Sequence, residues 1–205
     1  MRRFIFTLSA MLVVLLAGAV LLIRAQPDDV SRAMALLQTD ADCAAPCFMG
    51  IVPEQTTLTE LDDLFSQHPW IGDYQMNRGM AWGTGLLVWE WADPPADLID
   101  RSRTGTAWIE DSIVYWLKIP TRLTFGEIWL ALETPTRGLT QPTALFPPIT
   151  LHTATFDDVR VNLALTCPLR RQKLWRTPVD VLYGSGPVLE QEQYRLPPVG
   201  GCGLR

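Results

Sequence analysis

The chain has 205 residues, with 17 basic and 22 acidic side chains, and carries a net charge of −5 at pH 7. Nucleic-acid binding needs a basic surface that neutralises phosphates, so this acidic balance excludes nucleic acid as an expected partner. Eight tryptophans and sixteen prolines indicate bulky aromatic packing together with short elements and fixed turns.

The N-terminus carries two arginines followed by an uncharged, mostly apolar run over residues 4–23. About 20 such residues cross a ~30 Å hydrocarbon core as a helix. We therefore expect residues 1–25 to form a single-pass membrane anchor with a cytoplasmic N-terminus, because the arginines precede the run. The alternative is a cleaved signal peptide, for which Ile23-Arg24-Ala25 is a poor cleavage site. Both interpretations place the rest of the chain outside the cytoplasm.

Helical and strand patterns follow in turn. A short helix is expected over residues 30–38. Thr57-Leu58-Thr59-Glu60 is a capping box, in which the threonine hydroxyl accepts from a backbone N–H and Glu60 reaches back. Apolar residues then recur at helical spacing until Pro69 ends the helix. Alternating aromatic and branched residues predict a strand over 85–91 and a hairpin over 106–119.

The same order then restarts 67 residues after the first capping box. Thr124-Phe125-Gly126-Glu127 is a second box, and an apolar stripe follows it. Strands are expected over residues 149–156, 159–166 and 179–183, with a tight turn at Asp157-Asp158 between the first two. The repeated order of helix and strands predicts an internal duplication.

These patterns together predict an α+β fold class. An N-terminal transmembrane helix would be followed by two helix-plus-antiparallel-sheet repeats, at residues 26–120 and 121–205, the second ending in a Pro/Gly-rich tail. Each helix would pack on one face of its sheet, so the opposite face would stay open.

The four cysteines all follow the apolar run. An even count in an oxidising compartment predicts two disulfides among Cys43, Cys47, Cys167 and Cys202. Three pairings are possible, and local pairing, of Cys43 with Cys47 and of Cys167 with Cys202, is the simplest. A metal site is the alternative, but no second Cys or His pair lies nearby, so no metal is expected. A redox role for Cys43 and Cys47 conflicts with their three-residue spacer.

No catalytic motif stands out, so we expect a protein that is not an enzyme and has no cofactor. His68 lies at a predicted helix end, and His152 lies in a predicted strand with its side chain in solvent. Glu90 lies between Trp89 and Trp91 and would point away from both rings, because side chains alternate along a strand.

Four tryptophans on predicted strands are the candidate binding residues, since Trp is enriched at binding hot spots. They are Trp89, Trp91, Trp108 and Trp116. Alternation sends some of them to opposite faces of a sheet, so not all four can be buried in one core.

The segment Cys43-Ala44-Ala45-Pro46-Cys47-Phe48-Met49-Gly50-Ile51-Val52-Pro53 resembles the opening of uncharacterised exported bacterial proteins that carry a Cys-Pro-Cys-aromatic-x-Gly-Ile-x-Pro-Gly-x-Thr pattern. Glu54 stands where that pattern usually has Gly. The helix starts at Thr57 and at Thr124 resemble those of the outer-membrane assembly lipoprotein BamE and of the β-lactamase inhibitor protein. This resemblance implies a non-catalytic protein-binding scaffold.

The expected function is therefore binding of another protein of the cell envelope through the open sheet faces. The alternative is a carbohydrate-binding or other small-ligand protein, even a hydrolase, that uses the tryptophans and Glu90. A glycosidase would need a second carboxylate about 5–10 Å away. An aromatic groove with paired carboxylates would favour the ligand, and flat Trp-rich faces would favour a protein partner.

Overall fold

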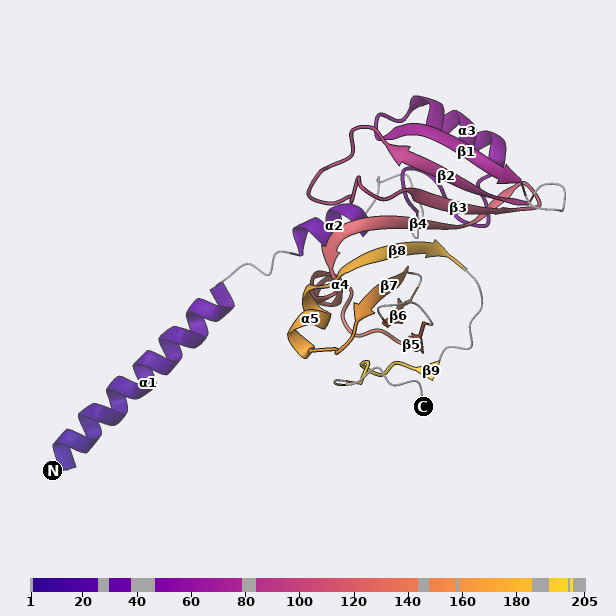
Figure 1. Ribbon diagram of the computed structural model, residues 1–205. Helices are drawn as coiled ribbons and strands as arrows, with labels where there is room; N and C mark the ends of the chain where they lie inside the picture. The colour runs from indigo at the N-terminus through magenta and orange to yellow at the C-terminus, as the bar shows by residue number, and fades with distance from the viewer. Residues whose placement is uncertain are drawn as a thin grey trace.

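The computed structural model describes residues 2–25, 30–37, 47–78, 84–143, 148–157, 159–185, 192–198 and 200, without the side chains of residues 2–9, 22–25, 78 and 192. Its described helices are α1 (Arg2–Ala25), α2 (Ser31–Leu37), α3 (Leu58–Gln67), α4 (Phe125–Leu132) and α5 (Arg171–Arg176). Its described strands are β1 (Ile71–Arg78), β2 (Gly85–Trp91), β3 (Gly105–Glu110), β4 (Ile113–Thr124), β5 (Arg137–Pro142), β6 (Ile149–Phe156), β7 (Val159–Thr166), β8 (Pro178–Gly184) and β9 (Glu192–Gln193). Figure 1 shows α1 projecting away from the strands.

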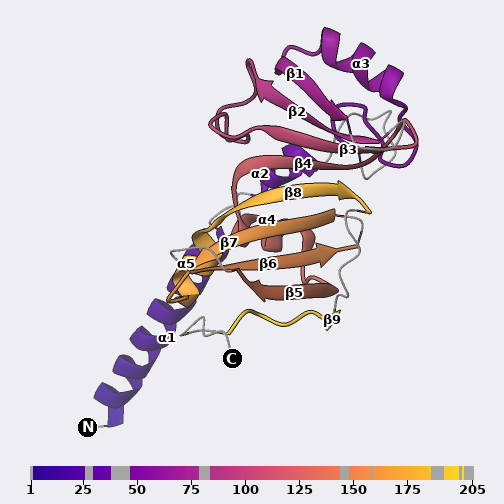
Figure 2. The ribbon, with the colours of Figure 1, turned by 45° about the vertical axis from the view of Figure 1, so that its right-hand side comes forward.

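All the described strands belong to one sheet, in the order β1-β2-β3-β4-β8-β7-β6-β5-β9. Every neighbouring pair is antiparallel. The sheet passes from its first to its second half where β4 pairs with β8, with Leu117 opposite Tyr183 and Ile119 opposite Val181. Figure 2 shows the strands following one another without a break from β1 to β9.

The helices cover one face of this sheet. In β2 every second residue is buried, including Trp89, and the Phe65 ring of α3 packs edge-on against Trp89 at 5.1 Å. At the other end Phe125 of α4 packs edge-on against His152 of β6. Followed from strand to strand, the register shows that the side chains of Trp89 and His152 point to the same side of the sheet. Helices α3 and α4 therefore lie on the same face.

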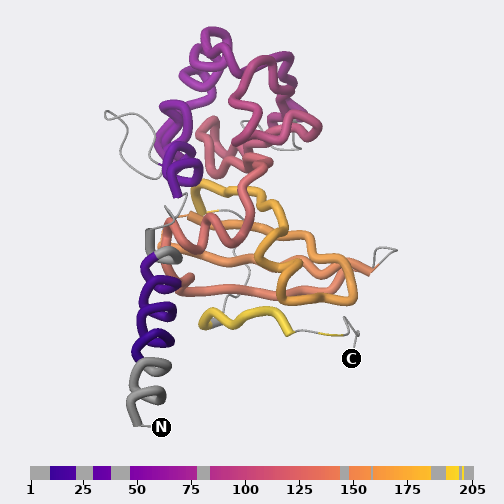
Figure 3. The backbone as a smooth tube through the Cα atoms, turned by 90° about the vertical axis from the view of Figure 1, so that its left-hand side faces the viewer, coloured from indigo at the N-terminus to yellow at the C-terminus, as the bar shows by residue number. Residues whose placement is uncertain are grey.

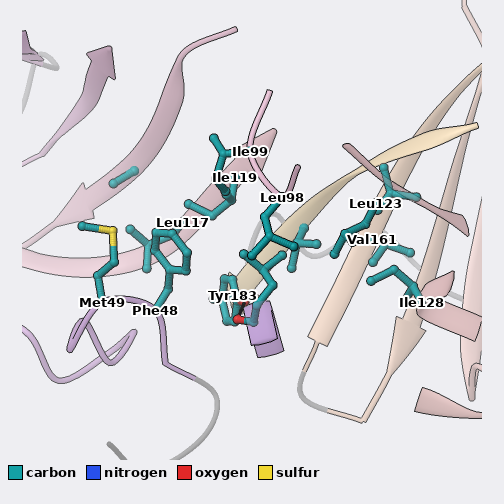
Figure 4. Close-up of a cluster of buried hydrophobic side chains, with 14 of the residues drawn as sticks. Phe48, Met49, Leu98, Ile99, Leu117, Ile119, Leu123, Ile128, Val161 and Tyr183 are labelled. Carbon is teal, nitrogen blue, oxygen red and sulfur yellow. Dashed lines mark hydrogen bonds between the residues drawn. The ribbon is translucent and has the colours of Figure 1, made fainter. Parts of the chain in front are cut away.

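The middle of the same face is covered by α2, which lies between α3 and α4 (Figure 3). The Tyr183 hydroxyl of β8 donates a hydrogen bond to the Leu36 carbonyl of α2, and Arg32 of α2 forms an ion pair of 2.7 Å with Glu127 of α4. Figure 4 shows the resulting core running from Phe48 to Ile128 without interruption, with Tyr183 near its centre.

Local signals in the sequence explain where several elements begin and end. Both predicted capping boxes are present, and they start α3 at Thr57 and α4 at Thr124. The predicted hairpin between β3 and β4 turns at Asp111 and Ser112, both of which have positive φ, as a two-residue primed turn requires. These predictions are confirmed.

The predicted fold class is wrong. Two separate helix-plus-sheet repeats would each carry a sheet of their own, whereas β4 and β8 join all the described strands into one antiparallel sheet. The two capping boxes gave the right helix starts but contained no information about this long-range pairing. The predicted division of the chain at residues 25 and 120 stays a prediction.

The predicted membrane anchor is also overturned for the described part of the chain. Crossing a bilayer takes about 20 consecutive apolar residues in one helix. Among the described residues no helix is both long enough and apolar enough, and the described side chains of α1 span only residues 10–21. The single-pass topology and the localisation that depended on it are therefore unsupported.

The predicted disulfides are likewise not supported. No disulfide joins two described cysteines, and Cys43 and Cys202 lie outside the described residues. Cys47 is buried, Cys167 is half-buried, and neither of them is a free thiol.

Candidate functional site

The face of the sheet opposite the helices has no described helix on it, and we call it the open face. Its residues are those that alternate with the buried core positions of each strand. Two cross-strand rows cross its middle. One row consists of Leu86, Trp108, Trp116 and Gly184, and the other of Val88, Thr106, Lys118, Leu182, Arg160, Thr155 and Arg137.

Two of the four candidate tryptophans meet on the open face. Trp108 of β3 and Trp116 of β4 are direct register partners, and both are half-buried. Directly opposed Cβ atoms in an antiparallel pair lie about 4.5–5.5 Å apart, so the two side chains leave the sheet next to each other. Gly184 follows Trp116 in the row, and a Cβ there would lie 2.6 Å from the Cβ of Pro53. The Pro53 ring therefore packs closely against the end of the sheet beside this pair.

The other two tryptophans belong to the core. Trp89 is 1% exposed and Trp91 is 8% exposed, with their rings 5.5 Å apart in an edge-to-face contact. Trp89 fits only because its neighbour across the strands is Gly105, where a Cβ would overlap the indole ring. Trp89 and Trp91 thus stabilise the fold and present no surface to a partner.

Glu90 has the orientation that alternation predicts. It is exposed, it lies between buried Trp89 and Trp91, and it shares the open-face side of β2 with Val88 and Leu86. The irregular register between Ile71 and Tyr74 leaves the exposed carboxylate Asp73 opposite Glu90 on β1. Trp89 and Trp91 are buried on the other face, and none of the described cavities is lined by Glu90, so these residues form no aromatic groove of the kind that the carbohydrate interpretation requires.

Basic side chains lie along the centre of the open face, although the chain as a whole is acidic. Lys118 lies between Leu117 and Ile119, both fully buried on the other face, and Arg160 lies next to fully buried Val161. Burial lowers the pKa of the Arg160 guanidinium, and its Nε is buried with no hydrogen-bond partner among the described residues. Sequence reasoning missed these cations, although a charged residue between two apolar strand positions is their signature.

Thr106 and Leu182 lie on the open face and are nevertheless only 9% and 5% exposed. Lys118 is the register partner of both. The four-carbon stem of a lysine can cover apolar neighbours while its amine stays in water. The low exposure of Thr106 and Leu182 means that neighbouring side chains cover them at the centre of the open face.

Three cavities are described, and one of them is lined by Gly184, the register partner of Trp116. A groove of about 690 Å³ runs between α3 and residues 50–56, and a cavity of about 310 Å³ lies at the sheet end beside Arg160 and Ser185. A third cavity, of about 300 Å³, lies at the β5–β9 edge. None of the three is lined by Trp108, Trp116 or Glu90.

The two histidines have structural surroundings. His68 caps the end of α3, and its Nδ1 accepts a hydrogen bond from the Trp70 backbone N–H. His152 was expected in solvent, but it is fully buried on the helix-covered face, which corrects that prediction. Its ring nitrogens lie 2.8 Å from the Thr140 hydroxyl and 3.1 Å from the Tyr194 hydroxyl, and burial lowers its pKa to about 4.

Fold and site together define a single-sheet protein that is covered by helices on one face and carries aromatic and cationic side chains on the other. No family model matches its sequence, and no match was found among curated proteins or solved structures. The resemblance drawn from the cysteine segment and the helix starts therefore stays a prediction.

Proposed function

We propose that the protein binds another protein on its open face and performs no chemistry there. The observation that carries the proposal is the cross-strand pair of Trp108 and Trp116, half-buried on a sheet face that no described helix covers. Tryptophans of this kind supply large, rigid contact area and dominate many interfaces.

The dimensions of the open face suit a protein partner. The eight strands β1 to β8, at about 4.8 Å spacing, span roughly 35 Å, and most of them have six to eight residues and span roughly 20 Å. The resulting area of roughly 700 Å² approaches the ~800 Å² that each partner buries in an interface of standard size. Small ligands bind in concave pockets instead, and the described cavities do not include the tryptophan pair.

A direct test compares captured proteins between matched variants of the full chain. The double variant Trp108→Ala, Trp116→Ala removes the open-face pair. Leu130→Ala is the control, because Leu130 is an apolar α4 residue with 60% of its surface exposed. We expect the unaltered chain and the control to recover the same protein, and the double variant to lose it.

The recovered protein is then purified and titrated against the three chains. An unchanged affinity for the double variant would show that the partner binds elsewhere and would overturn the proposal. Retention of a glycan or other small ligand without any protein partner would favour the ligand-binding alternative instead.

A further inference from the structure

We infer that the open face selects a partner segment whose carboxylate side chains lie beside apolar ones, and that Lys118 and Arg160 receive the carboxylates. The inference rests on the proposed function and adds the chemistry of the partner. Its observations are the spacing of these two cations, their lack of ion-pair partners and the apolar residues around them.

The two cations bracket an apolar residue. Lys118 on β4, Leu182 on β8 and Arg160 on β7 follow one another in register on three adjacent strands. Two strand spacings separate Lys118 from Arg160, so their Cα atoms lie roughly 10 Å apart. Trp116 precedes Lys118 by two positions and points to the same side. A segment lying across these strands would meet a cation, an apolar surface and a second cation in turn.

Neither cation is neutralised by the described chain. The ion pairs among the described residues involve Arg32, Arg101 and Arg103. Arg103 holds the open-face carboxylate nearest to Leu182, that of Asp180, through two contacts of 2.5 and 2.7 Å. Lys118 and Arg160 form no ion pair in the described part of the chain.

Arg160 is the stronger of the two sites. Its Nε is buried without a hydrogen-bond partner among the described residues, and an unsatisfied buried polar group costs free energy. An incoming carboxylate that accepts from the N–H groups of the two terminal guanidinium nitrogens, beyond the buried Nε, makes a stronger and better oriented contact than one to a single N–H. Glu54 and Asp157 line the cavity beside Arg160, but neither forms an ion pair with it in the described chain, and Glu54 accepts from Ser185.

The positive charge of Lys118 and Arg160 is opposite in sign to the net charge of the whole chain. Because the chain carries −5 overall, long-range electrostatics would repel an acidic partner. Any preference for acidic segments must therefore come from close contacts on the open face. This makes the preference specific to Lys118 and Arg160 and separates it from general charge attraction.

The test uses a displayed library of random short peptides, selected against the full chain. A parallel selection against the Trp108→Ala, Trp116→Ala variant identifies peptides that need the tryptophan pair. We expect those peptides to be enriched in Asp and Glu next to aromatic or aliphatic residues. One enriched peptide is then synthesised with its acids intact and with each Asp or Glu changed to Asn or Gln.

The two peptides are titrated against the unaltered chain, Lys118→Gln and Arg160→Gln, with Arg122→Gln as the control because Arg122 is exposed and lies outside the two rows. Loss of one charged hydrogen-bonded contact is expected to weaken the acidic peptide about tenfold. The neutral peptide should bind the unaltered chain more weakly than the acidic peptide does. Its affinity should change little in either the Lys118→Gln or the Arg160→Gln variant.

The outcomes separate the inference from the proposed function. Peptides that need the tryptophan pair but show no acidic enrichment would overturn the inference and leave the proposed function standing. The inference would also be overturned if the unaltered chain bound the acidic and the neutral peptide equally well and Arg160→Gln changed neither affinity. The proposed function would then still stand. Failure to select any peptide that depends on Trp108 and Trp116 would overturn both.

Discussion

The surroundings of each strand residue in this protein depend on the side of the sheet to which its side chain points. His152 and Thr153 are neighbours in β6, yet the first is fully buried among aromatic rings and the second lies on the open face. The imidazole of His152 is kept neutral by burial, and each of its nitrogens has a hydroxyl partner that can donate or accept.

The buried imidazole predicts a pH dependence of stability. Folding lowers the pKa of His152 from its usual 6.5 to about 4. The unfolded chain therefore takes up a proton first as pH falls. The contribution of His152 is fully present above pH 6.5 and is lost between pH 6.5 and about 4, by at most about 1.4 kcal/mol per pH unit.

Urea unfolding of the unaltered chain and of His152→Gln, measured at several pH values, isolates this contribution. The free energy of unfolding of the unaltered chain should approach that of the variant as the pH is lowered through this window. A difference between the two that stays constant from pH 7 to pH 4 would contradict the assignment of a neutral, buried His152.

Burial of Trp89 depends on a glycine in the next strand. A methyl group at Gly105 would overlap the indole ring of Trp89. Gly105→Ala is therefore expected to destabilise the fold by about 1–3 kcal/mol, the usual cost of overpacking a core. Gly18→Ala is the control, since a Cβ at Gly18 meets nothing within 4 Å. Equal midpoints of urea unfolding for the two variants would contradict the packing described.

At the scale of elements, helix starts and hairpins could be predicted from the sequence because their signals are local. The capping boxes at Thr57 and Thr124 and the strands at 85–91, 149–156 and 159–166 were all found from spacing and turn residues. Strands β1 and β5 were missed because they lie near the sheet edges and are rich in polar residues, Gly and Pro.

The first capping box gives a prediction for α3. The Thr57 hydroxyl accepts from the Glu60 N–H, and Glu60 accepts in return from the Thr57 N–H at 2.8 Å. Thr57→Ala removes the hydroxyl and is expected to lower the free energy of unfolding by about 1 kcal/mol. Thr59→Ala changes the same residue type two positions further along, within the first turn of the same helix.

The Thr59→Ala control has no cap to lose and replaces Thr with a better helix former, so its stability should be unchanged or slightly higher. Both values come from denaturant unfolding followed by far-UV circular dichroism. A loss of similar size in the two variants would mean that helix propensity, and not the cap, sets the stability of α3.

At the scale of the whole molecule, the sequence could not predict how the two halves meet. The pairing of β4 with β8 joins segments about 60 residues apart, and no local pattern specifies it. The arrangement of the candidate site could not be predicted from the sequence for the same reason. Trp108 and Trp116 were chosen for their residue type, but only the register showed that they are partners and that Trp89 and Trp91 belong to the core.

One sheet and one core predict one cooperative unfolding transition. Leu117 is fully buried at the junction, opposite Tyr183, so Leu117→Ala should cost about 2–5 kcal/mol. Circular dichroism and tryptophan fluorescence should report the same midpoint before and after the change. Two separated transitions would instead favour the division of the chain at residue 120.

The central claim is that a partner protein sits on the open face, and site-specific photo-crosslinking tests it most directly. A photoreactive amino acid is placed at position 86 in one full chain, because Leu86 is the register partner of Trp108 on the open face and both tryptophans are then kept. As the control it is placed at position 130 in another chain, because Leu130 is exposed on α4. We expect a cross-linked partner from position 86 and none from position 130. Cross-linking from position 130 alone would place the partner on the helix-covered side and contradict the account.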